Sequence, residues 1–158
     1  MKITNHRLEG RSIDYRESPN QGASYAPGAL DTIIIHYTAG ADAESSIRTL
    51  SDTERKVSAH LVVGRDSSVT QMLPFNTIGW HAGVSKWGDR EGFNKYSIGI
   101  EIDNAGQLEE KDGQYVSWFG QAYPPEEVVR GVHRNQTEPT FWHRFPEEQV
   151  RVVEDLCQ

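Results

Sequence analysis

Glu101 is a carboxylate inside an apolar segment, and this is where the sequence most clearly suggests chemistry. It lies in the run 98–102, where Ile98, Ile100 and Ile102 face one side of an expected strand and Gly99 and Glu101 the other. A carboxylate in such surroundings is costly unless it is paired, and burial raises its pKa. Those properties suit a general acid and base, with Gly99 leaving room beside the carboxylate. The alternative is a carboxylate at a solvated sheet edge or in a structural ion pair.

His36 directly follows the β-branched run 32–35. The carboxyl ends of central strands are where open α/β sheets place ligands and catalytic groups, so His36 is a candidate metal ligand or base. A structural histidine with satisfied hydrogen bonds is the alternative. Catalytic zinc takes three protein ligands and keeps one open position. The sequence has no H-E-x-x-H helix, so any zinc ligands must converge from separate segments.

The remaining histidines have weaker contexts. Trp80, His81 and Ala82 precede Gly83 in a segment suited to the loop wall of a pocket. His60 follows Ser58 and Ala59 in an expected strand, and we interpret it as a packed or hydrogen-bonded structural histidine. His133 and His143 are interpreted as surface or local-packing residues, and His6 has no supporting context.

These side chains require a mixed α/β (α+β) fold with a central sheet. Runs of apolar residues predict strands at 32–35, 57–63, 69–73 and 96–102, and the turn at 64–68 joins the middle two as a hairpin. The run 32–35 is too apolar for half exposure, which predicts a central strand covered on both faces. Helices are expected over 42–54 and from Pro146 onward, where proline and acidic residues suit a first turn.

We expect residues 1–158 to form a single domain with two irregular parts. Residues 1–30 are polar and turn-rich, which predicts an irregular lead-in. Residues 105–143 show no clear period and predict an insertion with little regular structure, packed by Trp118, Phe119, Trp142 and Phe145. The apolar stripe of the last helix is still running at Gln158, so we expect the natural polypeptide to continue.

Charge and composition exclude several classes of partner. The 158 residues carry a net charge of −7, which argues against nucleic acid and gives no support for binding an anionic membrane. The single cysteine, Cys157, excludes an internal disulfide and a cysteine-based zinc site. No early segment resembles a signal peptide, so a cytoplasmic protein is expected; a phage or effector protein exported without a signal would look the same. The oligomeric state is left open.

Four segments together resemble the type 2 N-acetylmuramoyl-L-alanine amidases, zinc enzymes related to peptidoglycan recognition proteins and amidase-type phage lysozymes. Each segment is a weak signal alone, but the four occur in the family's order and spacing. The resemblance is close over residues 30–104 and looser over 105–158. The segments are IIIHYTAG (33–40), VSAH (57–60), GWHAGVS (79–85) and NKYSIGIE (94–101).

The resemblance implies hydrolysis of the amide between N-acetylmuramic acid and L-alanine, with peptidoglycan or a muropeptide as the substrate and Zn²⁺ as the cofactor. It implies that His36 is the first zinc ligand and Glu101 the catalytic acid and base. The residues implied to contact substrate are Tyr37, Thr38, Trp80, His81, Ala82 and Asn94.

The chain also departs from the family pattern. The family's other zinc ligands follow its C-terminal helix, so they are expected beyond residue 158. A module that binds muropeptides without cleaving them therefore remains the alternative function.

Overall fold

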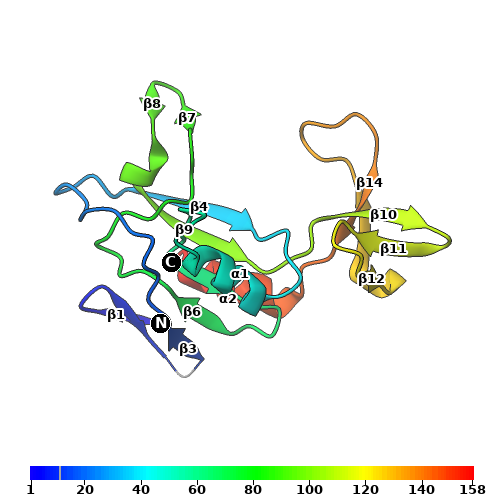
Figure 1. Cartoon of the computed structure of the whole chain (residues 1–158), viewed down its shortest axis with the longest axis horizontal. Coiled ribbons are helices and arrows are strands. Elements are labelled where there is room, and N and C mark those ends of the chain that lie inside the picture. Colours follow the sequence, from blue (N-terminus) through cyan, green and yellow to red (C-terminus); the bar gives the residue numbers. More distant parts are fainter. Residues whose placement is uncertain (11) are drawn as a thin grey trace.

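The computed structural model describes residues 1–10 and 12–158, and its main part is a five-stranded mixed sheet between two helices (Figure 1). The strand order is β3-β6-β5-β9-β4, in which only the β5–β6 pair is antiparallel. The strands are β3 (Ile13–Tyr15), β6 (Val69–Gln71), β5 (Leu61–Val63), β9 (Ser97–Ile102) and β4 (Thr32–Tyr37). The predicted mixed sheet is confirmed. The hairpin expected from strands at 57–63 and 69–73 forms with the shorter strands Leu61–Val63 and Val69–Gln71, and the strand expected at 96–102 forms at Ser97–Ile102.

Helix α1 (Ala43–Ser51) covers one face of this sheet, and its start is fixed by a capping box. The Asp42 carboxylate accepts a 2.6 Å hydrogen bond from the Ser45 backbone N–H, which satisfies one of the free donors of the first turn. Ile47 and Leu50 then pack against Val62 of the sheet. The predicted helix at 42–54 is confirmed, although it ends at Ser51.

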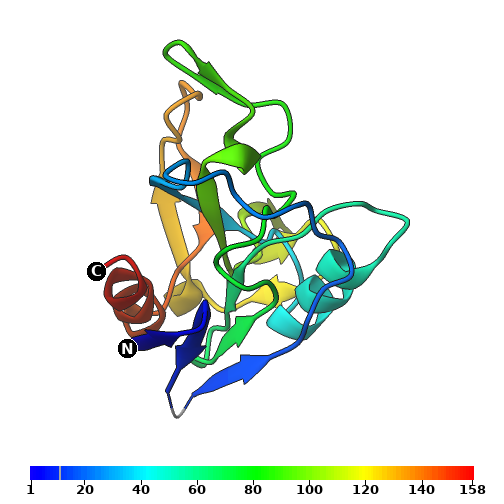
Figure 2. The same cartoon turned by 90° about the vertical axis from the view of Figure 1, so that its left-hand side faces the viewer.

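Helix α2 (Glu147–Leu156) covers the opposite face, as Figure 2 shows. Val153 packs into the core formed by Leu61, Val63 and Ile100. The fully buried Gln149 side chain donates to the carbonyls of Val63 and Asp103 at 3.1 and 2.9 Å, which ties α2 to the strand ends. Neither helix in the described ranges is long and apolar enough to cross a membrane.

The prediction that the strand after Asp31 is central and covered on both faces is wrong. Within the described residues, β4 pairs only with β9 and forms an edge of the sheet. Ile33 and Ile35 are 43% and 51% exposed, because β4 lies at the edge of the sheet and neither side chain reaches the core cluster that packs against α2. The continuous apolar run at 32–35 therefore predicted a strand buried on both faces, but the described part of the chain leaves one of its faces partly exposed.

The expectation of little regular structure in residues 105–143 is also wrong. This segment forms a second, antiparallel five-stranded sheet of order β12-β11-β10-β14-β13, set beside the first (Figure 1). Its small core contains Ala105, Leu108 and Tyr123. Its strands are β10 (Gln107–Lys111), β11 (Gln114–Ser117), β12 (Ala122–Tyr123), β13 (Val128–Gly131) and β14 (Thr140–His143), with a 3-10 turn η2 at Pro125–Glu127.

Short strands also occupy the lead-in, which was expected to be irregular, and the segment 86–91. In the lead-in, of which residue 11 lies outside the described part, β1 (Lys2–Thr4) pairs with β2 (Arg7–Glu9), and β3 joins the main sheet. A small hairpin of β7 (Lys86–Trp87) and β8 (Arg90–Glu91) projects from the molecule before the 3-10 turn η1 (Phe93–Lys95).

A pair of neighbouring isoleucines tests the exposed face of β4. Ile35 and Ile100 are register partners on adjacent strands, but they are 51% and 1% exposed. We expect Ile100→Ala to lower the free energy of unfolding by about 2–5 kcal/mol, because it leaves a core cavity. Ile35→Ala should cost less than about 1 kcal/mol, because its side chain already meets solvent. Urea denaturation measures both, and equal losses would show that β4 is covered in solution.

Candidate active site

The site begins with the parallel pairing of β4 and β9. Register places His36 beside Glu101 and Ile34 beside Gly99, so these four residues share the α1-facing side of the sheet. The sequence suggested that Gly99 leaves room for the Glu101 carboxylate. In the structure it leaves room for the imidazole of His81. A Cβ on Gly99 would lie 2.4 Å from Cγ of His81, so only glycine lets that ring rest against the strand.

The loop carrying His81 is held by two side chains. The amide oxygen of Asn94 accepts hydrogen bonds from the backbone N–H groups of His81 and Ala82 at 3.0 and 2.7 Å. The Ser58 hydroxyl accepts from the Trp80 N–H at 2.9 Å. Asn94 therefore positions the loop from behind.

His81 of this loop connects two other histidines, His36 and His60, in a chain of side-chain contacts. His36 Nε2 lies 3.1 Å from His81 Nδ1, and the rings of His81 and His60 meet edge to face. His60 is fully buried; its Nδ1 accepts from the Gly99 N–H at 3.0 Å, and its Nε2 lies 2.8 Å from the Thr77 carbonyl oxygen. These contacts give His60 a structural role, which agrees with its interpretation from the sequence.

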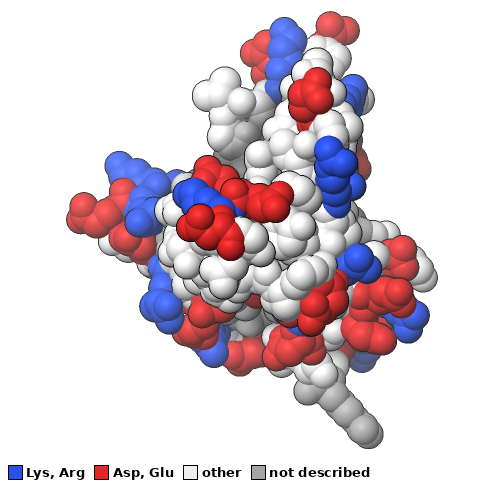
Figure 3. Space-filling view, turned by 90° about the vertical axis from the view of Figure 1, so that its right-hand side faces the viewer, with Lys and Arg blue, Asp and Glu red and all other residues white. Residues whose placement is uncertain are grey.

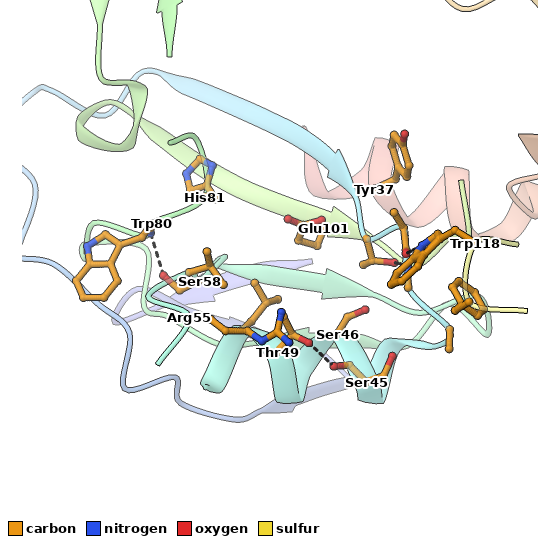
Figure 4. A pocket seen from close by; sticks show the side chains of 17 residues that line it. Tyr37, Ser45, Ser46, Thr49, Arg55, Ser58, Trp80, His81, Glu101 and Trp118 are labelled. Carbon is orange, nitrogen blue, oxygen red and sulfur yellow. Dashed lines mark hydrogen bonds between the residues drawn. The ribbon is translucent and has the colours of Figure 1, made fainter. Parts of the chain in front are cut away.

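A pocket of about 540 Å³ opens over Glu101 between α1 and the second sheet (Figure 4). Tyr37, Thr38, Trp80 and His81 line it, as the sequence suggested. His36, Ala82 and Asn94 are not among the lining residues. Sequence analysis missed Arg55, Ser58 and the α1 side chains, and it assigned Trp118 and Phe119 to packing although they line the pocket.

The pocket strongly alters the ionisation of Glu101. Burial raises its pKa from the ordinary 4.5 to about 7, because desolvation disfavours the carboxylate. Within the described residues no cation pairs with it and no hydrogen bond reaches its oxygens. Arg55 is the single Lys or Arg lining the pocket in the part of the chain that the structure describes, and its guanidinium is engaged by Asp52 at 3.4 Å.

Comparison with known proteins decides the family. Residues 26–158 match the Amidase_2 family, N-acetylmuramoyl-L-alanine amidase. The chain belongs to this amidase family. The matched range includes all the site residues described above, from His36 to Phe119.

Individual relatives of the amidase chain cover parts of it. It is 45% identical over 60 residues to 1,6-anhydro-N-acetylmuramyl-L-alanine amidase AmpD of Escherichia coli, covering 38% of this chain and 33% of AmpD. It is 33% identical over 118 residues to the E. coli amidase AmiD, covering 70% of this chain and 40% of AmiD. The chain thus spans well under half the length of these curated relatives.

The fold also matches a solved amidase. The structure of AmiD from E. coli in complex with the substrate anhydro-N-acetylmuramic acid-L-Ala-D-γ-Glu-L-Lys aligns with a TM-score of 0.56 and 27% identity. The alignment covers 85% of this chain and 43% of AmiD. The mixed sheet with its two helices is therefore the architecture of this family.

Buried His60 should make the fold sensitive to acid. Desolvation lowers its pKa from 6.5 to about 4, so the folded state favours the neutral ring. Its contribution is complete above pH 6.5 and is lost as the pH falls toward 4, by on the order of 3 kcal/mol. His81, whose pKa desolvation also lowers to about 4, adds to the same slope.

Urea denaturation between pH 7.5 and 4.5 measures this slope. We expect His60→Gln to flatten it and the exposed-site variant His133→Gln to leave it unchanged. An unaltered slope in His60→Gln would contradict the burial of a neutral ring.

Proposed function

We propose that this chain carries the catalytic carboxylate of an enzyme that hydrolyses the amide between N-acetylmuramic acid and L-alanine. The observation that carries the proposal is Glu101, desolvated in a pocket and without a partner among the described residues. Family membership supplies the reaction class, and the AmiD complex supports a muropeptide as the substrate class.

Glu101 suits proton transfer at neutral pH. Because burial brings its pKa to about 7, the carboxylate can take a proton from the attacking water, and the resulting acid can return it. The proton then goes to the amine nitrogen as the carbon–nitrogen bond breaks. A carboxyl group with the ordinary pKa of 4.5 would hold that proton less readily at pH 7.

The described residues do not by themselves fit a complete zinc centre, although the family generally depends on zinc. Catalytic zinc takes three protein ligands, and residues 1–10 and 12–158 contain no group of three His, Cys, Asp or Glu side chains placed to hold a metal. We keep His36 as the proposed first ligand because it lies beside Glu101 at the end of β4.

The alternative function is a module that binds muropeptides without cleaving them, for which the pocket alone would suffice. The two functions differ in whether free stem peptide is formed. An amidase releases free stem peptide from a muropeptide, whereas a binding module returns the muropeptide intact.

The variant Glu101→Gln tests the proposed role of this carboxylate. We expect it to fold and bind muropeptide but to release stem peptide about 10²–10⁴-fold more slowly, because the amide side chain cannot carry the proton. Chromatographic assay of the released peptide measures the rate.

Glu109→Gln is the matched control, since that glutamate lies on β10, outside the pocket, in an exposed ion pair with Lys111. Normal turnover of Glu101→Gln would make Glu101 structural. Wild-type protein that binds muropeptide and releases no peptide would favour the binding module.

A further inference from the structure

Trp118 is a large aromatic side chain that the second sheet places at the rim of the pocket (Figure 4). It occupies the turn between β11 and β12, where the Gly120 N–H donates to the Ser117 carbonyl at 2.9 Å and the Gln121 N–H to the Ser117 hydroxyl at 3.0 Å. Gly120 has a φ of +88°, a conformation that glycine adopts without strain. The turn that carries Trp118 is therefore well defined.

The indole N–H of Trp118 already has a hydrogen-bond acceptor within the protein. Its indole N–H donates a 2.7 Å hydrogen bond to the carbonyl of Ala39, in the loop that follows β4. Ala39 itself has a φ of +47°, which is uncommon for a residue with a side chain. The bond fixes the indole against the pocket rim and joins the two sheets there.

Trp118 as a whole residue is nevertheless 77% exposed. An apolar ring held in place but left open to solvent adds little to the core, since hydrophobic stabilisation follows the area that is buried. Phe119 lies beside it, with the two ring centroids 5.5 Å apart in an edge arrangement. The pair makes an aromatic wall that is available to a ligand.

The pocket has a different character on its other walls. In Figure 4, Trp118 lies on the opposite side of Glu101 from Trp80, and Arg55 lies on the wall formed by α1 and the segment after it. Figure 3 shows acidic and basic side chains interspersed over the face that the second sheet presents, without a continuous basic patch. The aromatic wall is thus suited to an uncharged group, and Arg55 to a carboxylate.

We propose that Trp118 is a substrate-binding residue that stacks on a sugar ring of the muropeptide, while the stem peptide extends toward Arg55. The inference rests on the proposed function, whose substrate has an uncharged sugar on one side of the scissile amide and a carboxylate-bearing peptide on the other. The C–H groups on one face of a pyranose are apolar and weakly positive, so they pack favourably on the negative face of an indole. The hydroxyl groups at the sugar edge stay in water.

Binding measurements on the 158-residue chain test this assignment with two separate probes. The probes are the disaccharide N-acetylglucosaminyl-N-acetylmuramic acid and the peptide L-Ala-γ-D-Glu-L-Lys, each titrated against ¹⁵N-labelled protein by NMR. We expect the disaccharide to shift the indole N–H resonance of Trp118. Trp118→Ala should weaken disaccharide binding about tenfold, the upper range for one aromatic contact, and leave peptide binding unchanged.

Two further variants separate stacking from the hydrogen bond and from general aromatic exposure. Trp118→Phe keeps an aromatic face but loses the N–H, so it should retain most of the disaccharide affinity. Trp87→Ala removes a tryptophan of similar exposure, 74%, from the β7–β8 hairpin outside this pocket, and should leave both affinities unchanged.

The outcomes distinguish this inference from the proposed function. Disaccharide binding that is equal in wild type and Trp118→Ala overturns the role of Trp118 alone, as does wild-type protein that binds only the peptide. Wild-type protein that binds neither probe overturns the proposed function and this inference with it.

Discussion

The site depends on the parallel pairing of β4 with β9, which holds six residue pairs in register. In a strand, successive side chains alternate between faces, so a slip of one residue would move His36 to the opposite side of the sheet from Glu101. The same register sets Gly99 next to Ile34, where the absent side chain admits the ring of His81. One strand pair thus positions the proposed base, the proposed metal ligand and the wall of the pocket.

Desolvation is the second feature that these groups share. Burial raises the pKa of Glu101 and lowers those of His60 and His81, and for each group desolvation is the largest cause. All three shifts favour the uncharged form, so this face of the sheet avoids buried charge. The carboxyl group is consequently available for proton transfer near neutral pH, and Arg55 supplies the cationic side chain of the pocket wall.

Sequence patterns predicted the elements that depend on local signals. The helix expected over 42–54 and the strand carrying Glu101 were predicted from neighbouring residues, and the structure has them at Ala43–Ser51 and Ser97–Ile102. The exposure of β4 could not be predicted in this way, because its apolar run indicates burial without identifying what covers it.

The second sheet was missed for a different reason. Its strand β10 pairs with β14, more than 30 residues later in the chain, and each strand has only two to five residues. Such short segments show little periodicity, and their pairing depends on distant partners. Trp118 was assigned to packing for the same reason. The string Trp118-Phe119-Gly120, an aromatic pair in a turn, was the available signal that it lies exposed at the pocket rim.

The central claim is that the scissile amide of a muropeptide lies at Glu101 between the two sheets. A structure of the Glu101→Gln chain bound to anhydro-N-acetylmuramic acid-L-Ala-γ-D-Glu-L-Lys tests it most directly. The account predicts the amide that joins the sugar lactyl group to L-alanine within hydrogen-bonding reach of the side chain at position 101, directly or through one water. A muropeptide bound with this amide remote from position 101, or bound outside the pocket, would contradict it.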